Sequence, residues 1–251
     1  MKIISTLISA TVALVLLGST ALAQEHTAKA HWGYTGHGSP EKWAELSPKN
    51  QMCGIGKNQS PINVTTSADA DLEALTITYK NPSTSIINNG HTIQVNIQDG
   101  DTLGVDGISF GLKQFHFHTP SENNIDGKSF PLEAHFVHLD KDDNIAVLAL
   151  MFEEGEANEN LAKIWEKMPL KADESADVVL KNIASALLPT KREYYRFNGS
   201  LTTPPCTEGV RWFVLKTPVS ISKEQVAKFL KVMKHPNNRP IQATNARVII
   251  K

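Results

Sequence analysis

Short runs of alternating apolar and polar residues dominate the chain between residues 72 and 152. The runs are LTITYK, HTIQVNIQ, LKQFHFH and LEAHFVHL, and the more continuously apolar NIAVLALMF follows them. Dipeptides that favour tight turns separate several runs; they are Asn89-Gly90, Asp99-Gly100, Asp106-Gly107 and Asp126-Gly127. The pattern predicts an extended, mostly antiparallel sheet in which NIAVLALMF is buried on both faces.

Helical patterns are fewer and come later in the chain. The segment SKEQVAKFLKVM, residues 222–233, has the capping-box pair Ser222 and Gln225 and repeats apolar residues at helical spacing. Shorter candidates are NENLAKIWEKM, residues 158–168, and ADVVLKNIASALL, residues 176–188. We therefore expect an α+β fold in which β structure dominates, with a large central twisted sheet and a few peripheral helices.

The first 23 residues have the pattern of a secretory signal peptide. One lysine precedes an apolar run, and Ala21-Leu22-Ala23 supplies the small residues of a cleavage site. A membrane anchor is the alternative, but the uninterrupted apolar run from Val12 to Gly18 is short for a membrane span. We expect cleavage after Ala23, a single domain over residues 24–251, and a periplasmic or secreted protein.

Charge and cysteine content narrow the function further. Of the 25 basic residues, Lys2 lies in the leader, so 24 remain against 26 acidic residues. This balance gives no indication of binding to nucleic acid or to an anionic membrane. In an oxidising compartment the two cysteines, Cys53 and Cys206, favour one disulfide between distant parts of the fold. Two separate buried thiols are the alternative.

The spacing of three histidines indicates a metal site. If LKQFHFH is a strand, alternation puts Gln114, His116 and His118 on one face. In LEAHFVHL, the same rule puts Glu133 and His135 on one face. If the two strands pair, the three imidazoles come together, and three neutral imidazoles with an open fourth position make a catalytic zinc site. Gln114 and Glu133 are of the types that orient such ligands through the second ring nitrogen.

Two other interpretations compete with the zinc site. Each histidine taken alone is more typical of a structural imidazole than of a ligand. The pattern His116-x-His118 followed by Glu122 also resembles the first metal motif of cupins, which are double-sheet barrels. Cupins, however, place a further histidine after a Pro-x-Gly turn, and no such turn precedes His135. The cupin reading is therefore disfavoured.

Seven segments, in this order, resemble the α-class carbonic anhydrases: HWGYTGHGSPEKW, NQSPINV, NNGHTIQV, QFHFHTPSEN, LEAHFVH, GSLTTPPCTEGVRW and NNRPIQ. The match runs from His31 to the C-terminus and is closest to bacterial members of secreted or periplasmic type. It implies a carbonate dehydratase that uses Zn²⁺ for the reversible hydration of carbon dioxide to bicarbonate and a proton. A side esterase activity and a homodimer are further expectations, and a catalytically silent binding module is the alternative.

The resemblance also implies roles for the reacting groups. His116, His118 and His135 match the zinc ligands, with Gln114 and Glu133 as their outer partners. Thr202 matches the threonine that accepts a hydrogen bond from zinc-bound hydroxide, the species that attacks carbon dioxide. Glu122 matches the glutamate that accepts the proton of that threonine, and His91 matches the proton shuttle.

The remaining matches concern the walls of the cavity. Thr203 matches a residue beside the bicarbonate site, and the cysteine pair matches the disulfide of secreted and bacterial members. The apolar wall for carbon dioxide corresponds to Val137, Val147, Leu201, Val210 and Trp212. The wall that orders water corresponds to Tyr34, Asn89 and Gln94.

Several positions differ from the animal pattern. Thr119-Pro120 follows His118 where animal members have tryptophan and glycine, and Asn123 follows Glu122 where they have histidine. Gln94 stands where asparagine is common. Alternation also puts His91 on the opposite parity from Gln94, so it does not predict that both line one cavity. We expect these changes to affect the order of water in the proton path more than the ligands.

Overall fold

A computed structural model of the protein describes residues 31–65 and 68–251. The expected signal peptide and its cleavage site lie outside the described residues. Within the described ranges, no helix is both long enough and apolar enough to cross a membrane.

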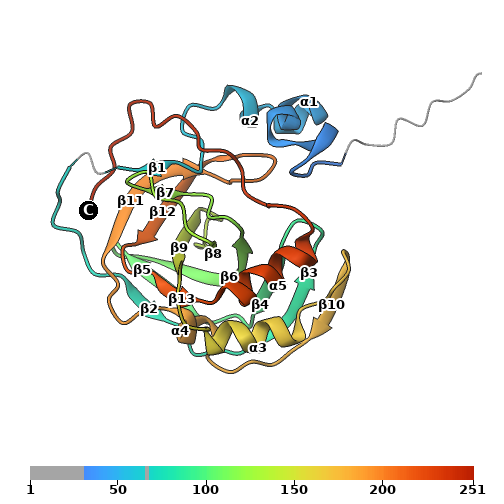
Figure 1. Cartoon of the computed structure of the whole chain (residues 1–251). Coiled ribbons are helices and arrows are strands. Elements are labelled where there is room, and N and C mark those ends of the chain that lie inside the picture. Colours follow the sequence, from blue (N-terminus) through green and yellow to red (C-terminus); the bar gives the residue numbers. More distant parts are fainter. Residues whose placement is uncertain (1–30, 66–67) are drawn as a thin grey trace, which may run out of the picture.

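One 11-stranded sheet occupies the centre of the described chain (Figure 1). Its strand order is β10-β3-β4-β6-β8-β9-β12-β11, while β13 also pairs with β9, and β5 pairs with both β2 and β6. The strands are β2 (Thr76–Thr78), β3 (Ser83–Asn88), β4 (Ile93–Ile97), β5 (Thr102–Val105), β6 (Ile108–His118), β8 (Leu132–Leu139), β9 (Ile145–Glu154), β10 (Glu174–Asp177), β11 (Tyr194–Ser200), β12 (Glu208–Leu215) and β13 (Val219–Ile221). The predicted sheet is confirmed, and it is larger than the sequence indicated.

Most neighbouring strands are antiparallel, as predicted. The exceptions are β12 and β13, which both run parallel to β9. A separate two-stranded parallel sheet joins β1 (Asn63–Val64) to β7 (Asn124–Ile125). The predicted strand LTITYK is shorter than expected, because only Thr76–Thr78 pairs as β2.

The predicted turns have the backbone that their residues favour. Asp106 and Gly107, at φ of +52° and +71°, join β5 to β6 with Val105 opposite Ile108. A two-residue hairpin turn of type I′ needs positive φ at both positions, which Asp-Gly tolerates well. Gly90, at φ of +80°, turns the chain between β3 and β4.

Three helices cover one side of the sheet: α3 (Glu159–Lys167), α4 (Ile183–Leu187) and α5 (Lys223–Met233) (Figure 1). The predicted capping box is confirmed, because Ser222 Oγ accepts from the Gln225 N–H and Gln225 Oε1 accepts from the Ser222 N–H. In α3, the buried Leu161, Ile164 and Trp165 share one face at helical spacing. Short helices α1 (Trp43–Leu46) and α2 (Met52–Ile55), with three 3₁₀ turns at Gly36–Gly38, Pro40–Lys42 and Pro48–Asn50, lie at the opposite end.

The helix expected over residues 176–188 is wrong in its first half. Glu174–Asp177 instead pairs with β3 as the edge strand β10, and the chain stays extended as far as Leu180, whose N–H donates to Ser83 Oγ. Pairing at the sheet edge satisfies these backbone groups, and Val178 and Val179 favour extended structure. The helix begins only after Asn182, at Ile183.

The sheet carries an apolar core on each face. Phe115 and Phe117 lie in the core beneath the helices, where the Phe117 ring is 4.8 Å from the Trp165 ring, centre to centre. Removing such a buried ring typically costs about 3–5 kcal/mol. Residues 146–152 of β9 are all buried and contribute to both cores, as predicted for NIAVLALMF. The alternation that buries Phe115 and Phe117 turns the intervening histidine to the other face.

Candidate functional site

Strands β6 and β8 bring three histidines together. The two strands are antiparallel, with His116 opposite His135 and His118 opposite Glu133. One ring nitrogen from each of His116, His118 and His135 lies within 4.8 Å of the others. The clustering predicted from alternation is therefore present in the structure.

The other ring nitrogen of each imidazole has a hydrogen-bond acceptor. His116 Nδ1 donates to Gln114 Oε1 at 2.8 Å, and His135 Nε2 donates to Glu133 Oε1 at 2.9 Å. His118 Nδ1 donates to the Asn237 carbonyl at 2.7 Å. These bonds leave His116 Nε2, His118 Nε2 and His135 Nδ1 to face one another, and His118 Nε2 is buried with no partner among the described residues.

A divalent metal ion fits this donor set. Metal-binding histidines commonly donate their second nitrogen to a carboxylate, carbonyl or amide oxygen, as all three do here. Burial lowers the pKa of all three imidazoles, and mutual repulsion further lowers that of His116 and His135. They are therefore neutral at pH 7, as ligands must be. Three imidazole nitrogens suit zinc among the common metals.

Glu133 is the best-anchored side chain of the site. It is fully buried, and its Oε2 accepts from the backbone N–H groups of Glu122 and Asn123 at 2.7 and 2.8 Å. Its Oε1 accepts from the Asn123 side-chain amide as well as from His135. Burial raises the pKa of Glu133 to about 7, and the bonds from Asn123 oppose that rise. A cation on the imidazoles would favour the charged carboxylate.

Glu122 is a second buried carboxyl beside the imidazoles. Its Oε2 lies 3.6 Å from His118 Nε2, and its Oε1 accepts from the Arg239 N–H at 2.8 Å. Burial raises the pKa of Glu122 well above its ordinary value, while the hydrogen bond from the Arg239 N–H and the nearby Thr202 hydroxyl oppose the rise. The predicted partners Glu122 and Thr202 are thus neighbours, although 80 positions separate them.

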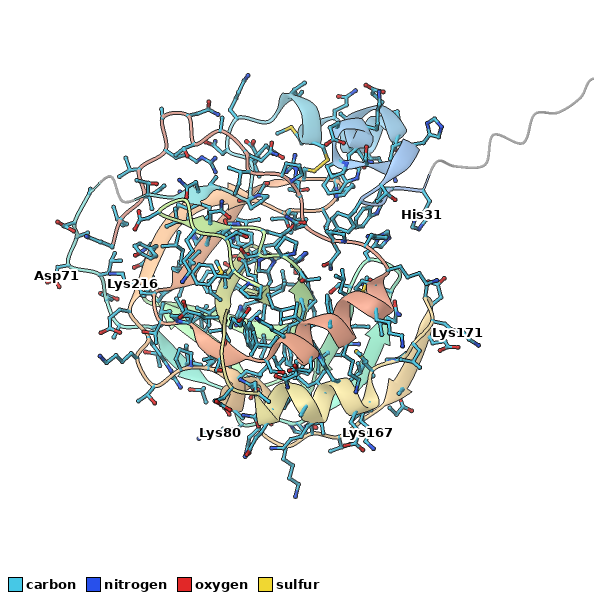
Figure 2. The ribbon with its side chains drawn as sticks, in the orientation of Figure 1. His31, Asp71, Lys80, Lys167, Lys171 and Lys216 are labelled. Carbon is cyan, nitrogen blue, oxygen red and sulfur yellow. A yellow bond between two sulfur atoms is a disulfide. The ribbon has the colours of Figure 1, made fainter. Side chains whose placement is uncertain are left out.

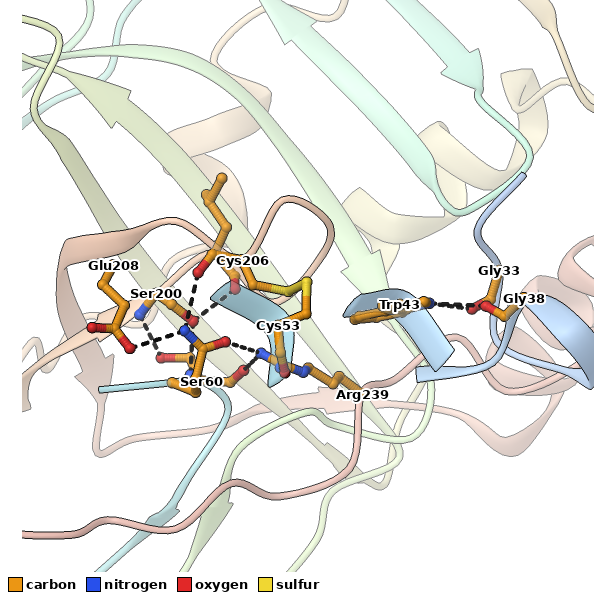
Figure 3. The surroundings of a disulfide bond; sticks show 11 residues. Gly33, Gly38, Trp43, Cys53, Ser60, Ser200, Cys206, Glu208 and Arg239 are labelled. Atoms are coloured by element: carbon orange, nitrogen blue, oxygen red, sulfur yellow. Dashed lines mark hydrogen bonds between the residues drawn. A yellow bond between two sulfur atoms is a disulfide. The ribbon is translucent and has the colours of Figure 1, made fainter. Parts of the chain in front are cut away.

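Thr202 lies on a loop, residues 201–207, which the predicted disulfide attaches to α2; we call it the threonine loop. Cys53 and Cys206 form that disulfide, so the alternative of two free thiols is excluded (Figure 3). Within the loop, the Cys206 N–H donates to the Thr203 carbonyl and the Leu201 N–H donates to the Thr207 carbonyl. Thr202 itself is buried.

Arg239 ties the other side of this disulfide to the site. Its guanidinium donates to the carbonyls of Cys53 and Ser60 and to Gln59 Oε1 (Figure 3). Gln59 in turn donates to the Cys206 carbonyl at 3.0 Å. Arg239 therefore holds Glu122 through its backbone N–H and the segment around the disulfide through its guanidinium.

A cavity of about 150 Å³ opens onto the imidazoles. It is lined by Trp32, Tyr34, Asn89, His91, Thr92, Gln94, Gln114, His116, His118 and Thr203. His91 and Gln94 both line it, although their parities differ, because His91 precedes β4 and the alternation of the strand does not extend to it. The hydroxyl oxygen of Tyr34 is buried without a partner among the described residues, and burial raises the pKa of Tyr34 well above its ordinary value.

His91 occupies the edge of the cavity in a stack of aromatic rings. Its ring lies parallel to that of Trp32 at 3.6 Å and to that of His31 at 5.0 Å, centre to centre. The pKa of His91 is lowered to about 4, mainly by burial; His31 and His235 contribute to the decrease, and Asp173 opposes it. Figure 2 shows His31 at the edge of the molecule, where the described chain begins.

The five predicted apolar wall residues do not line this cavity. They belong to the second core, where Val147, Val210 and Trp212 are buried and Val137 and Leu201 are half-buried. Trp212 lies opposite Val147 in the sheet, and its ring stands edge-on to the His135 ring at 4.9 Å. The apolar cluster therefore lies directly beside the imidazoles.

Sequence reasoning gave no role to four residues that contact the site. Asn237 and Arg239 occur in the segment NNRPIQ, and Asn123 was noted only as a difference from animal members. Trp32 occurs in the segment HWGYTGHGSPEKW. The signal in each case was a polar or aromatic residue within a recognised segment, but their contacts span up to 186 positions and have no local periodicity.

Comparisons with known proteins agree with this geometry. Residues 38–251 match the family described as eukaryotic-type carbonic anhydrase. A carbonic anhydrase of Pectobacterium carotovorum is 51% identical over 237 residues, which cover 94% of this chain and 97% of that protein. A carbonic anhydrase of Neisseria gonorrhoeae is 51% identical over 242 residues, 95% of each chain.

A solved structure gives the same result for the fold. The α-carbonic anhydrase from Thermovibrio ammonificans, solved in complex with the inhibitor sulfanilamide, matches with a TM-score of 0.86 and 50% identity. The match covers 88% of this chain and 99% of that one. Neither a cupin barrel nor an unrelated sheet protein accounts for a match of this extent, and the chain belongs to the eukaryotic-type, or α-class, family of carbonic anhydrases.

Proposed function

We propose that this chain catalyses the reversible hydration of carbon dioxide to bicarbonate and a proton, with Zn²⁺ held by His116, His118 and His135. The observation that carries the proposal is the cluster of three neutral imidazoles. Each has its second nitrogen fixed by an acceptor, and the cluster lies at a cavity in a chain of this family. Family membership favours this function over the cupin alternative.

In carbonic anhydrases, the standard case of this chemistry, bound zinc lowers the pKa of a water molecule to about 7 and so supplies hydroxide at neutral pH. The protein must hold the three imidazoles neutral and in a fixed orientation. Gln114, Glu133 and the Asn237 carbonyl do this by accepting a hydrogen bond from the second ring nitrogen, which prevents each ring from rotating.

Thr202 and Glu122 act together on the nucleophile. With its proton directed toward the Glu122 carboxylate, the Thr202 hydroxyl can only accept a hydrogen bond on its other side. That arrangement favours an O–H group over anions that have no proton to donate. The Arg239 N–H donates to Glu122 Oε1, which leaves Glu122 Oε2 to accept the proton of Thr202.

The walls of the cavity divide the remaining tasks. Carbon dioxide has little polarity, so the apolar cluster of Val137, Val147, Leu201, Val210 and Trp212 beside His135 is suited to bind it. Thr203 lines the cavity where bicarbonate would leave. Tyr34, Asn89 and Gln94 place polar groups around the remaining space, where they would order water.

His91 is the proton acceptor in this proposal. In its stacked position its pKa is about 4, so the ring is neutral at pH 7 and ready to accept a proton. A catalytic acid or base works best with a pKa near the working pH, so transfer to a group of pKa about 4 is unfavourable. We therefore expect proton transfer through His91 to limit turnover when the buffer concentration is low.

The proposed location of the enzyme rests on the expected signal peptide and on the disulfide. A signal peptide over residues 1–23 and one disulfide both suit a periplasmic or secreted protein. Hydrolysis of small esters as a side activity and association into a homodimer complete the proposal.

Stopped-flow measurement of carbon dioxide hydration, together with zinc analysis, tests this function. We expect about one zinc per chain and a rate far above that of buffer, both lost in His116→Ala because one of three ligands is removed. Lys113→Ala, an exposed neighbour on the same strand, is the matched control and should keep both. Zinc-loaded protein with no rate above buffer would instead indicate the binding module, and His116→Ala with full zinc would remove the ligand assignment.

A further inference from the structure

Asn237 is a buried asparagine whose polar atoms are all engaged. It follows α5 in the segment NNRPIQ and has no exposed surface. Its carbonyl accepts from His118 Nδ1, as described above. Its side chain makes three further bonds: Oδ1 accepts from the Thr119 N–H at 2.8 Å, and Nδ2 donates to the carbonyls of Phe117 and His91, each at 2.9 Å.

These side-chain bonds connect two parts of the site. Phe117 and Thr119 flank the ligand His118 at the end of β6, while His91 lies on the turn before β4. One amide group therefore joins the main chain of the ligand strand to the main chain of the proposed proton acceptor. Losing its donors would take from the His91 carbonyl the hydrogen bond that ties it to this group, whereas the Phe117 carbonyl would keep a second donor in the Thr92 hydroxyl.

The turn that carries His91, residues 89–92, has few other anchors; we call it the shuttle loop. Asn89 Oδ1 accepts from the His91 and Thr92 N–H groups, which shapes the turn but does not attach it to the rest of the protein. The Thr92 hydroxyl donates to the Phe117 carbonyl at 2.6 Å and accepts from the Phe117 N–H. The shuttle loop is thus pinned to β6 at Thr92, and the His91 carbonyl is held by Asn237.

The imidazole of His91 lacks such anchors. Within the described residues it is held by stacking with Trp32 and His31, with no hydrogen bond to the ring. Its distance from the metal ligands is therefore determined by where the main chain of His91 is fixed. Asn237 holds the main chain of His91 itself, and the Thr92 hydroxyl holds the next residue.

We propose that the side chain of Asn237 is a positioning residue for proton transfer, which fixes His91 relative to the ligand strand. The inference rests on the proposed function of His91 as proton acceptor. It is separate from the bond between the Asn237 carbonyl and His118, which belongs to the main chain and survives a change of side chain. Transfer over a chain of hydrogen bonds is sensitive to position, and a displacement of about 1 Å can cost about 100-fold.

The test is Asn237→Asp, which keeps the shape and the acceptor for Thr119 but removes both donors. Because Thr92 still pins the shuttle loop, we expect kcat at low buffer concentration to fall by about tenfold. The ratio kcat/KM and the zinc content should stay within about twofold of the parent, since the ligands are untouched. Added imidazole buffer should restore kcat, and the NMR signals of the His91 ring should broaden or shift.

Asn238→Asp is the matched control, because it makes the same change one residue further along, where the side chain has no hydrogen bond among the described residues. Should Asn237→Asp fail to fold, the uncharged Asn237→Ser is judged by the same criteria. A folded Asn237 variant with unchanged kcat would overturn the proposal. Equal losses of kcat, kcat/KM and zinc would overturn it as well, because they indicate a structural role at the metal site.

His91→Ala separates this proposal from the function on which it rests. If His91→Ala lowers kcat at low buffer and the Asn237 variant does not, only the role of Asn237 fails. If His91→Ala has no effect, the shuttle itself fails and the role of Asn237 with it. When both act through one step, the double variant should be no slower than His91→Ala alone, whereas additive losses would contradict the coupling.

Discussion

His116 and His135 lie opposite each other on paired strands, and each ring is fixed by a hydrogen bond from its second nitrogen. His91 and Thr202 face the same site from loops. The His91 ring is held by stacking, and Thr202 lies on the threonine loop, which the disulfide attaches to α2. The ligands therefore take their positions from the register of the sheet. His91 and Thr202 depend instead on contacts with distant parts of the chain, which are the ring stacking on His91 and the disulfide at Cys206; we call these contacts the clamps.

The difference separates two requirements of catalysis. Metal binding needs three rigid nitrogens, and strands with satisfied ladders provide them. Orienting the nucleophile and moving the proton need groups outside the two ligand strands, and Thr202 and His91 lie on loops. We expect changes to the clamps to alter rate more than zinc affinity, and changes on the strands to alter both.

Loss of the disulfide should have the largest effect. Cys53 and Cys206 are 153 positions apart, and in the chain-entropy model a loop of that length gives about 5 kcal/mol, which is an upper figure. The double variant Cys53→Ser, Cys206→Ser should lose up to this amount of unfolding free energy, measured by urea denaturation. At temperatures where it stays folded, its hydration rate should fall more than its zinc affinity, because the threonine loop loosens while β6 and β8 do not.

Reduction of the parent protein with dithiothreitol is the control for the serine substitutions. It should reproduce the double variant in both stability and rate. A double variant that loses zinc affinity and rate in equal proportion would show that the strand-borne ligands also depend on the clamp.

The residues of the site that lie on β6 and β8, which we call the strand half, were predictable because the alternation of side chains along a strand is a local rule. Alternation placed Gln114, His116 and His118 on one face without any knowledge of the rest of the fold. The same rule failed at His91, which precedes its strand, and helical periodicity failed over residues 176–182, where pairing with β3 overrode it. Local pattern is reliable only where the element extends over the residue in question.

Glu133→Gln is the matching test on the strands. The carboxylate accepts from His135 and also from three N–H groups of Glu122 and Asn123. Each carboxylate oxygen accepts from two donors, so a glutamine at 133 must point its NH₂ group at two of them, and two bonds become repulsive contacts. We expect zinc affinity to fall by about 10–100-fold, measured by competition with a chelator of known affinity.

Gln114→Glu is the companion variant, because it places a charged acceptor on His116 and leaves the geometry intact. It should keep or raise zinc affinity, since a carboxylate increases ligand basicity. If Glu133→Gln binds zinc as tightly as the parent, hydrogen bonding to the second ring nitrogen is not what holds the strand half in place.

The residues of the site that lie on loops, which we call the loop half, could not be predicted from local sequence patterns alone. The resemblance to carbonic anhydrases named His91, Thr202 and Glu122, but no spacing connects them. Asn237 and Arg239 were hidden for the same reason, since they lie 119 and 117 positions from the ligand and the carboxyl that they hold. Such contacts form only once the sheet and the C-terminal segment are in place.

The smallest expected effect concerns the charges around His91. His31 lowers its pKa and Asp173 raises it, and both effects are smaller than that of burial. His31→Ala should therefore raise the pKa of His91 from about 4, and Asp173→Asn should lower it further, as measured by NMR titration of the ring. A higher pKa brings the acceptor closer to pH 7, so His31→Ala should also speed proton transfer at low buffer.

His37→Ala is the control for these two variants, because His37 is an exposed histidine on the same N-terminal segment and has no part in the shift. If His31→Ala and Asp173→Asn moved the pKa of His91 in the same direction, neighbouring charge would not be the cause. The position of the ring in its stack would then control the pKa. In that case the contacts that position the His91 ring, and not the charges at the edge of the cavity, would determine the rate of proton transfer.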